Sequence, residues 1–389
     1  MPFHNEPERV LTECFGPGET ASVVTVPGRV NLIGEHVDYH NLPVLPMAIP
    51  RSVRVAFRAR SDRRIRGASA GYGQRDFEWT PSLEPSAPGD WENYIKAAAQ
   101  AVWDRWRPSC GIDAGVVSDL PPAAGLSSSS AVLTGFTLAL LRANGIQAGF
   151  AELMEVLPEG EYFVGTRGGG MDHAAVLECR AGSALLVRFA PVAATPVPMP
   201  AGWAFLVAHS LTTAEKSGAV KAEYNSRRTA GTRALARLGF ESYAAALDAH
   251  PFDELAALAE KRLEGEEQSC FLHVAGEANR VNLAIEALRN GDAPGFGQLL
   301  NASHHSLRDL LRVSNAQLDE LVEAAVAAGA LGARLTGAGF GGCAVVFCRR
   351  EDRPAVRKGL IERYYFGRQD FNEEAHLIDA EPSAGALHV

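Results

Sequence analysis

The sequence predicts an α+β fold in two halves, of which the first is richer in β-sheet. Three observations predict it: β-branched and alternating apolar segments dominate the first quarter of the 389 residues, helical spacing of Ala, Leu, Glu and Arg fills residues 213–330, and a glycine-rich strand pattern returns near residue 340. A chain of this length is expected to form about two domains, each able to bury its own core.

The first half is expected to combine sheet and helix. Its expected strands lie at residues 21–26, 30–33, 53–57 and 116–117. Its expected helices, where apolar residues recur at helical spacing, lie at residues 91–106, 131–143 and 150–162. The segment 174–189 is expected to form a strand hairpin with its turn at residues 180–183, and the four prolines within residues 190–202 predict a linker.

The second half is expected to be helical up to about residue 330, with a strand at residues 343–347. The last forty residues, after Arg349, carry no motif, and their apolar positions are expected to pack as a closing helix and strand. We predict two domains, residues 1–194 and residues 195–389.

Composition and charge exclude several classes of protein. The net charge of -9 argues against a nucleic-acid partner or an anionic membrane surface, both of which require a basic surface. The sequence has neither a leader-like apolar segment nor about 18 consecutive apolar residues, so we expect a cytoplasmic protein without membrane contact, as a monomer or an oligomer. Six scattered cysteines predict free thiols, and no Cys/His group, the neighbouring His304 and His305 included, has the spacing of a metal site.

The strongest local signal is the sequence PPAAGLSSSSA at residues 121–131. A glycine and a run of serines lie between a strand and an apolar helix, so backbone N–H groups, hydroxyls and the helix N-terminus converge on one point. The alternative is an ordinary serine N-cap, but four consecutive serines exceed that need. The segment therefore predicts a phosphate-binding loop, and no Walker A sequence occurs elsewhere in the chain.

A second glycine run, at residues 337–342, matches GxGxxG by its letters. The strand pattern that follows it contradicts a dinucleotide-binding fingerprint, which requires a helix there. A tight loop that brings the backbone close to a ligand, or to the other glycine loop, is the interpretation that remains.

Two polar clusters complete the candidate site. The sequence PGRVNLIGEHVD at residues 27–38 places an arginine, two carboxylates and a histidine beside a buried-looking strand, which suits hydroxyl recognition as well as a solvated turn. Three glycines precede Asp172 at residues 168–170 and are expected to place it at the edge of a strand, either as a turn residue or as a base.

Taken in this order, the segments resemble those of the galactokinase family, within the GHMP small-molecule kinase superfamily. GRVNLIGEHVDY is similar to the family's N-terminal signature, PPAAGLSSSSA to its phosphate loop and LTGAGFGGCAVV to its C-terminal motif. The segments WENYIK at residues 91–96 and YNSRR at residues 224–228 also resemble family segments, so that the resemblance covers about residues 20–350. It implies a two-domain GHMP kinase fold with the active site in the cleft between the domains.

The resemblance also implies an activity, the transfer of the ATP γ-phosphate to the C1 hydroxyl of a galactose-type sugar, and roles for individual residues. Asp172 matches the aspartate beside the attacking hydroxyl, and Arg29 the arginine next to it. Sugar-binding positions match Glu35, His36, Asp38, Gly169 and Tyr224. Positions around ATP match Trp91, Gly125, Leu126, Ser127, Ser128, Ser129 and Ser130. The implied Mg²⁺ ligands match Ser129 and Glu161.

Departures from the family pattern concern the sugar. His40-Asn41-Leu42-Pro43 replaces a loop that is commonly Asn-Gly-Gly-Phe, and Gly-Gly-Gly-Met-Asp-His at residues 168–173 replaces Cys-Gly-Ile-Met-Asp-Gln. The triple glycine resembles the N-acetylgalactosamine kinase branch, where small residues leave room for a 2-acetamido group, whereas residues 224–228 resemble the galactokinase form. We favour galactose, with N-acetylgalactosamine or a related C1 sugar kinase reaction as the alternative. A non-catalytic sugar- and ATP-binding regulator is the alternative of another class.

Overall fold

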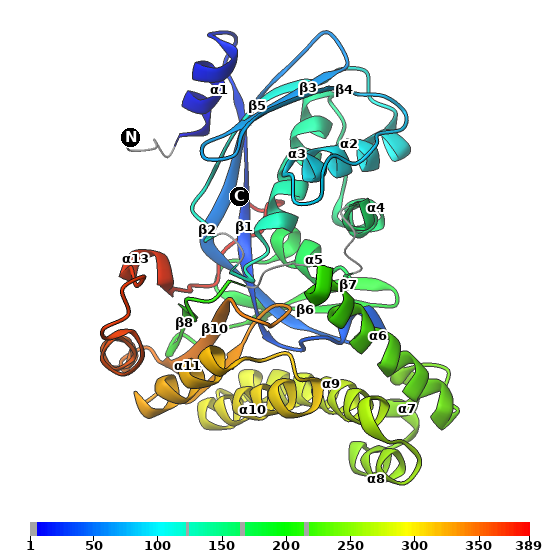
Figure 1. Cartoon of the computed structure of the whole chain (residues 1–389), viewed down its shortest axis with the longest axis vertical. Coiled ribbons are helices and arrows are strands. Elements are labelled where there is room, and N and C mark those ends of the chain that lie inside the picture. Colours follow the sequence, from blue (N-terminus) through cyan, green and yellow to red (C-terminus); the bar gives the residue numbers. More distant parts are fainter. Residues whose placement is uncertain (1–5, 122–123, 164–167, 214–217) are drawn as a thin grey trace.

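The computed structural model describes residues 6–121, 124–163, 168–213 and 218–389. Two separate sheets, a hairpin and the helices around them form the molecule (Figure 1). The strands are β1 (Ser22–Ile33), β2 (Leu45–Ala59), β3 (Arg64–Ser69), β4 (Gly73–Glu78), β5 (Ile112–Ser118), β6 (Ser183–Phe189), β7 (Val192–Pro198), β8 (Trp203–His209), β9 (Gly332–Leu335), β10 (Cys343–Arg349) and β11 (Leu377–Asp379).

The first sheet has the strand order β1-β2-β5-β3-β4, in which only the β3–β5 pair is parallel. Of its two long strands, β1 is buried from Val26 to its end at Ile33, and β2 is buried at its start, residues 45–49, and again over most of residues 53–57. Helix α3 (Ser128–Ala143) packs on this sheet with most of its side chains buried, because it is apolar all round. Helix α3 contacts α2 (Glu92–Trp106), α4 (Phe150–Phe163) and α5 (Met171–Glu178), whereas α1 (Pro7–Phe15) packs on β5 and β2.

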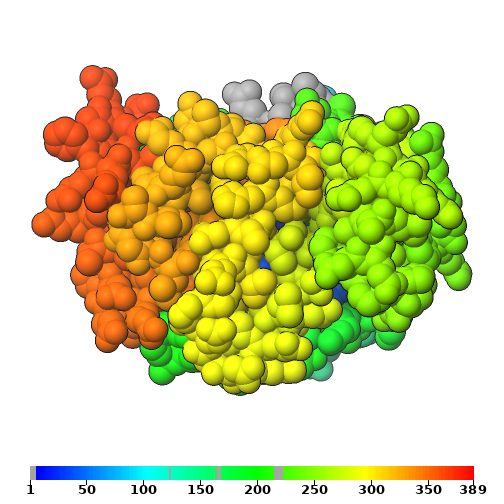
Figure 2. Space-filling model, turned by 90° about the horizontal axis from the view of Figure 1, so that it is seen from below, coloured from blue at the N-terminus to red at the C-terminus, as the bar shows by residue number. Residues whose placement is uncertain are grey.

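The second sheet has the order β11-β8-β10-β9 and is antiparallel throughout. Helices from the second half of the chain pack on this sheet or on one another and form the lower face of the molecule (Figure 2). They are α6 (Gly218–Leu238), α7 (Tyr243–Ala249), α8 (Phe252–Arg262), α9 (Gly265–Asn290), α10 (Ala293–Ser306), α11 (Ala316–Ala327), α12 (Arg353–Leu360) and α13 (Glu373–His376), with the short helices η2 (Leu307–Leu311) and η3 (Ile361–Tyr365). A further short helix, η1 (Asp38–His40), lies between β1 and β2 in the first half.

The expected strands and helices are confirmed with two exceptions. Residues 171–178 form helix α5, so the predicted strand hairpin at 174–189 is wrong in its first half, and Asp172 lies in the first turn of a helix instead of at the edge of a strand. Gly170 has φ +98°, which is not a helical conformation, so the helix begins at the next residue. The run MDHAAVLE that follows favours a helix. The linker expected at 190–202 is also wrong, because β7 pairs with β6 over residues 192–198.

The prolines at residues 190–202 are compatible with a strand because of where this strand lies. Within its two-stranded sheet β7 pairs only with β6, and a strand with a free edge tolerates proline because it needs few N–H donors. The domain boundary at residue 194 stays a prediction. All six cysteines are free thiols, as expected, and no helix among the described residues is long and apolar enough to cross a membrane.

A buried network of charges holds the end of β1 against the second half of the chain. Arg334, which is fully buried in β9, donates through Nη1 to the carbonyls of Asn31 (2.8 Å) and Leu32 (3.0 Å). Glu277, buried in α9, accepts from the backbone N–H of Gly34 (2.9 Å) and from the hydroxyl of Ser303 (2.6 Å). The residues that carry the predicted sugar signature are therefore held by groups of the C-terminal half.

We predict that Glu277→Gln destabilises the protein by about 3–5 kcal/mol, the cost of breaking a buried ion pair. Burial alone would raise the pKa of Glu277, but Arg280 and Arg334 lower it to about 2, whereas an unfolded chain has a glutamate pKa of about 4.3. The stabilisation is therefore complete above the unfolded pKa and is lost as the pH falls toward 2. Urea unfolding should show the wild-type advantage shrinking between pH 5 and pH 3.

The control is Glu13→Gln, which removes an exposed i,i+4 partner of Arg9 and should change the unfolding free energy by less than about 1 kcal/mol. Equal effects of the two substitutions would contradict the role assigned to Glu277.

Candidate active site

The predicted site residues, apart from Trp91, gather where five elements meet. These elements are the end of β1 with the turn after it, the first turn of α3, the last turn of α4, the start of α5, and α6. Asp172 on α5 and Arg29 on β1 lie 143 residues apart in the sequence but are in direct contact. The phosphate loop joins them through its backbone. Two of its residues, Pro122 and Ala123, lie outside the described residues.

The ion pair between Arg29 and Asp172 is the electrostatic centre of the site. Arg29 donates through Nε to Oδ1 of Asp172 (2.7 Å), and its Nη2 lies 2.7 Å from the same oxygen. Its third nitrogen, Nη1, donates to the carbonyl of Gly125 in the phosphate loop (2.6 Å). Burial alone would raise the pKa of Asp172, but the Arg29 charge and the Ser127 hydroxyl lower it below its ordinary value. Asp172 is therefore an ionised carboxylate suited to accept a proton.

The two glycine-rich loops lie back to back. A Cβ built on Gly125 would lie 3.0 Å from the carbonyl oxygen of Thr336, and one built on Gly337 would lie 2.9 Å from the carbonyl oxygen of Gly125. Both glycines have positive φ, +75° and +84°. A Cβ on Gly342 would likewise lie 2.8 Å from the carbonyl oxygen of Ala124. The expected close approach of the two loops is thus confirmed, and side chains at these positions would prevent it.

Two buried carboxylates face the backbone of neighbouring loops. Glu35 accepts from the N–H of Gly337 (2.6 Å) and from the hydroxyl of Thr336 (3.3 Å), and burial raises its pKa. Asp38 accepts from the N–H of Gly169 (3.1 Å). Burial, followed by the nearby charges of Asp172 and Glu35, raises the pKa of Asp38 to about 6.

Gly169 is required by this contact. A Cβ there would lie 2.3–2.6 Å from atoms of Asp38 and Tyr39, which is closer than Cβ atoms approach other atoms in real proteins.

An aromatic cluster adjoins these carboxylates. His36 has φ 60°, and its Nδ1 and Nε2 lie 3.1 Å from the hydroxyl of Tyr39 and from the carbonyl of Ala338. Its ring lies 5.1 Å from that of Tyr224, which lies 5.6 Å from that of Tyr39. Burial lowers the pKa of His36 to about 3, so that the ring is neutral. The contacts bring α6 of the second half to the predicted sugar signature.

The serine run begins helix α3. Ser127 is in the left-handed region with φ 60°, and Ser128, Ser129 and Ser130 form the first helical turn, where the backbone N–H groups and the helix dipole favour an anion. Ser130 donates to Oε1 of Glu161 across from it (2.9 Å). The helix was expected to start only at residue 131, so the phosphate loop and the helix overlap by three residues.

The remaining ATP position, Trp91, caps helix α2. Its indole Nε1 donates to the carbonyl of Tyr72 (3.1 Å), and its ring lies 6.3 Å from that of Phe136 in α3. The sequence analysis missed Tyr39, Thr336 and Arg334, which complete the polar contacts around residues 31–38. Thr336 and Arg334 directly precede the second glycine run. Two polar residues among the apolar residues of an expected strand were the signal in the sequence that could have identified them.

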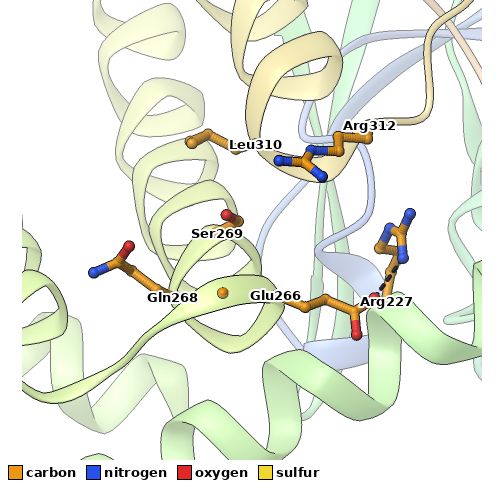
Figure 3. Close-up of a pocket in the computed structure, with 7 residues that line it drawn as sticks. Arg227, Glu266, Gln268, Ser269, Leu310 and Arg312 are labelled. Carbon is orange, nitrogen blue, oxygen red and sulfur yellow. Dashed lines mark hydrogen bonds and ion pairs between the residues drawn. The ribbon is translucent and has the colours of Figure 1, made fainter.

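A pocket of about 270 Å³ lies elsewhere, between α6, the start of α9 and the end of η2 (Figure 3). Arg227 on α6 pairs there with Glu266 on α9, while Arg312, Ser269 and Gln268 contribute further polar side chains. It shares no residue with the predicted site.

Comparison with known proteins identifies related sequences. Residues 12–59 match the galactokinase galactose-binding signature, residues 93–179 the GHMP kinases N-terminal domain and residues 284–365 the GHMP kinases C-terminal domain. A galactokinase of Chloroflexus aurantiacus is 37% identical over 349 residues, which cover 88% of this chain and 87% of the relative. A galactokinase of Streptomyces coelicolor is 33% identical over 382 residues, covering 97% and 96% of the two chains.

Solved structures agree with the sequence comparison. The crystal structure of Lactococcus lactis galactokinase complexed with galactose is similar with a TM-score of 0.87 at 26% identity and covers 97% of both chains. The structure of L. major mevalonate kinase in complex with R-mevalonate is similar in fold, with a TM-score of 0.63 at 21% identity, and covers 95% of this chain and 99% of its own. The predicted α+β, two-domain GHMP kinase fold is therefore confirmed.

We predict that Gly337→Ala weakens nucleotide binding at least tenfold, because the new Cβ displaces the backbone of Gly125. Positive φ alone would cost about 1 kcal/mol, and the backbone contact adds to it. Calorimetric titration with an ATP analogue and thermal unfolding measure the two effects.

The matched control is Gly239→Ala, which has the same positive φ (+83°) but no atom within 4 Å of the new Cβ. It should lower stability only by the backbone term and leave nucleotide binding unchanged. Equal nucleotide affinity of both variants would contradict the loop contact.

Proposed function

The chain belongs to the galactokinase family of the GHMP kinases, and we propose that it transfers the γ-phosphoryl group of ATP to the C1 hydroxyl of galactose, giving galactose 1-phosphate and ADP. One observation carries the proposal: Arg29 binds the Asp172 carboxylate and the carbonyl of Gly125 at the same time. It thereby links a proton acceptor to a phosphate loop. We also propose that the protein works in the cytoplasm as a monomer, with an oligomer as the alternative.

Phosphoryl transfer requires positioning of the reactants and neutralisation of phosphate charge rather than covalent chemistry by the protein. In our proposal the N–H groups of Gly125 to Ser130 and the α3 N-terminus hold the phosphates, while Trp91 lies near the adenine. Asp172 accepts or orients the C1 hydroxyl proton, and Arg29 keeps that carboxylate ionised and stabilises the charge that develops in the transition state.

The proposed sugar-binding residues surround the same point. Asp38 and Glu35 would accept hydroxyl hydrogen bonds, His36 and Tyr224 would contact the ring, and Gly169 would bring its backbone close to it. The support is their position: Asp38 is hydrogen-bonded to the glycine turn that carries Asp172, and burial of both carboxylates makes recognition of hydroxyl groups more discriminating.

The donor set beside the serine run fits Mg²⁺. This ion prefers oxygen ligands and is usually held by one or two protein oxygens together with substrate phosphates. The hydroxyl of Ser129 and the carboxylate of Glu161 supply such oxygens. The carboxylate lies beside the serine run, because Ser130, the residue after Ser129, donates a hydrogen bond to it. When bound, Mg²⁺ would neutralise phosphate charge.

The geometry of the glycine turn favours galactose over N-acetylgalactosamine. A Cβ on Gly168 would point at Oε2 of Glu161 (2.8 Å), and one on Gly170 would point at Met154 (3.2 Å) and Pro158 (3.4 Å). Both directions lead toward helix α4. The absent side chains therefore leave space on the α4 side of the turn rather than a cavity for a 2-acetamido group beside Asp172.

A coupled ADP-release assay tests the proposal. We expect galactose-dependent ADP formation, at least tenfold less with N-acetylgalactosamine and glucose, and intermediate rates with 2-deoxygalactose and arabinose. A higher kcat/KM with N-acetylgalactosamine would overturn the choice of sugar. Sugar and ATP binding without ADP formation would support the non-catalytic regulator instead.

We predict that Asp172→Asn lowers kcat by about 10²–10⁴-fold, the contribution of a positioned proton acceptor, while galactose still binds. Steady-state kinetics and calorimetric titration with galactose measure the two quantities separately. Asp76→Asn, which removes a surface partner of Arg64, is the control and should leave both unchanged. Near-normal turnover of the Asp172 variant would rule out the assignment.

A further inference from the structure

Three residues from different elements converge on the carboxylate of Glu161. Ser130, in the first turn of α3, donates to Oε1 (2.9 Å), and Nε2 of His173, on α5, lies 3.3 Å from the same oxygen. Gly168 lies beside the other oxygen, since a Cβ there would be 2.8 Å from Oε2. Two of the three, Gly168 and His173, are departures from the common family segment.

His173 has little freedom to turn away from this contact. The residue is fully buried on α5, and its Nδ1 lies 3.5 Å from the hydroxyl of Thr134, which is also fully buried, one turn along α3 from Ser130. Burial and these two neighbouring oxygen atoms restrict the orientation of the imidazole ring, and residues outside the first shell fix the ligands of metal sites in a similar way.

We propose that Ser130 and His173 are positioning residues that hold Glu161 in the orientation required by the metal–nucleotide complex. This inference rests on the proposed function, and specifically on Glu161 as a ligand of Mg²⁺. It adds two residues that no sequence motif assigns to that role. Gly168 contributes by having no side chain where the carboxylate lies.

The arrangement also connects the two reacting sides of the site. Ser130 follows Ser129, the other proposed metal ligand, and His173 follows Asp172, the proposed proton acceptor. Through Glu161 the first turn of α3 is tied to the first turn of α5. A shift of Glu161 would therefore change the metal position relative to Asp172, and distances of this kind control the rate of transfer strongly.

The test measures metal binding directly. Mn²⁺ is titrated into the full-length enzyme with ADP and followed by electron paramagnetic resonance, using Ser130→Ala, His173→Leu and His173→Gln. Outer-shell changes typically weaken metal affinity by about 10–100-fold. We expect about tenfold weaker Mn²⁺ binding for Ser130→Ala and His173→Leu. His173→Gln keeps a polar side chain with an N–H group at this position and should stay within about threefold of the wild type.

Thr137→Val is the matched control, because it also removes a fully buried hydroxyl from α3 but none of the contacts given above involves it. It should leave Mn²⁺ affinity unchanged. Galactose affinity, measured without metal, should stay constant in all four variants and shows that each is folded.

Unchanged Mn²⁺ affinity in folded Ser130→Ala and His173→Leu would overturn the proposal, as would equal losses in His173→Leu and His173→Gln. Failure of the proposed function has a different signature. The wild type would then form no ADP from any sugar, whatever the Mn²⁺ titrations show.

Discussion

The predicted site depends on direct backbone contact between two loops that lie more than two hundred residues apart. Gly125 and Gly337 touch through main-chain atoms, and a single methyl group on either would push them apart. Charged residues of the site are held by these two loops. The carbonyl of Gly125 binds Arg29, Arg29 binds Asp172, and the N–H of Gly337 binds Glu35. The absence of side chains is therefore what allows charged side chains from both halves to meet.

The net charge of the chain and the charges within the site differ in what they indicate about function. The chain as a whole is acidic, with a net charge of -9, and yet it belongs to a family of enzymes that bind ATP. Even locally three carboxylates, Glu35, Asp38 and Asp172, lie together, and burial raises the pKa of the first two. Only Asp172 has a lowered pKa, because Arg29 is in contact with it. One arginine thus distinguishes the proposed proton acceptor from its neighbours, which net charge cannot show.

Sequence patterns correctly predicted the helices and strands whose type follows from a local pattern of apolar residues. The apolar run of α3 and the alternation in β2 are examples, since their burial follows from local periodicity. Residues 174–178 were mistaken for strand because their apolar character fits both structures in a short segment, and the glycine that starts the helix precedes them. The prolines of β7 suggested a linker because the sequence does not show that this strand has only one neighbour.

The same distinction applies to the site. Motifs located Arg29, Asp172 and the serine run because each lies in a contiguous signature. They could not locate Arg334, whose donors reach carbonyls about three hundred residues away, nor show that the carboxylate of Glu161 meets both Ser130 and His173. The triple glycine is the clearest case. The sequence shows that side chains are absent at Gly168 and Gly170, but only the direction of each Cα–Cβ vector decides whether the space serves the sugar or helix α4. A departure from a family motif therefore becomes an argument about specificity only when its direction is known.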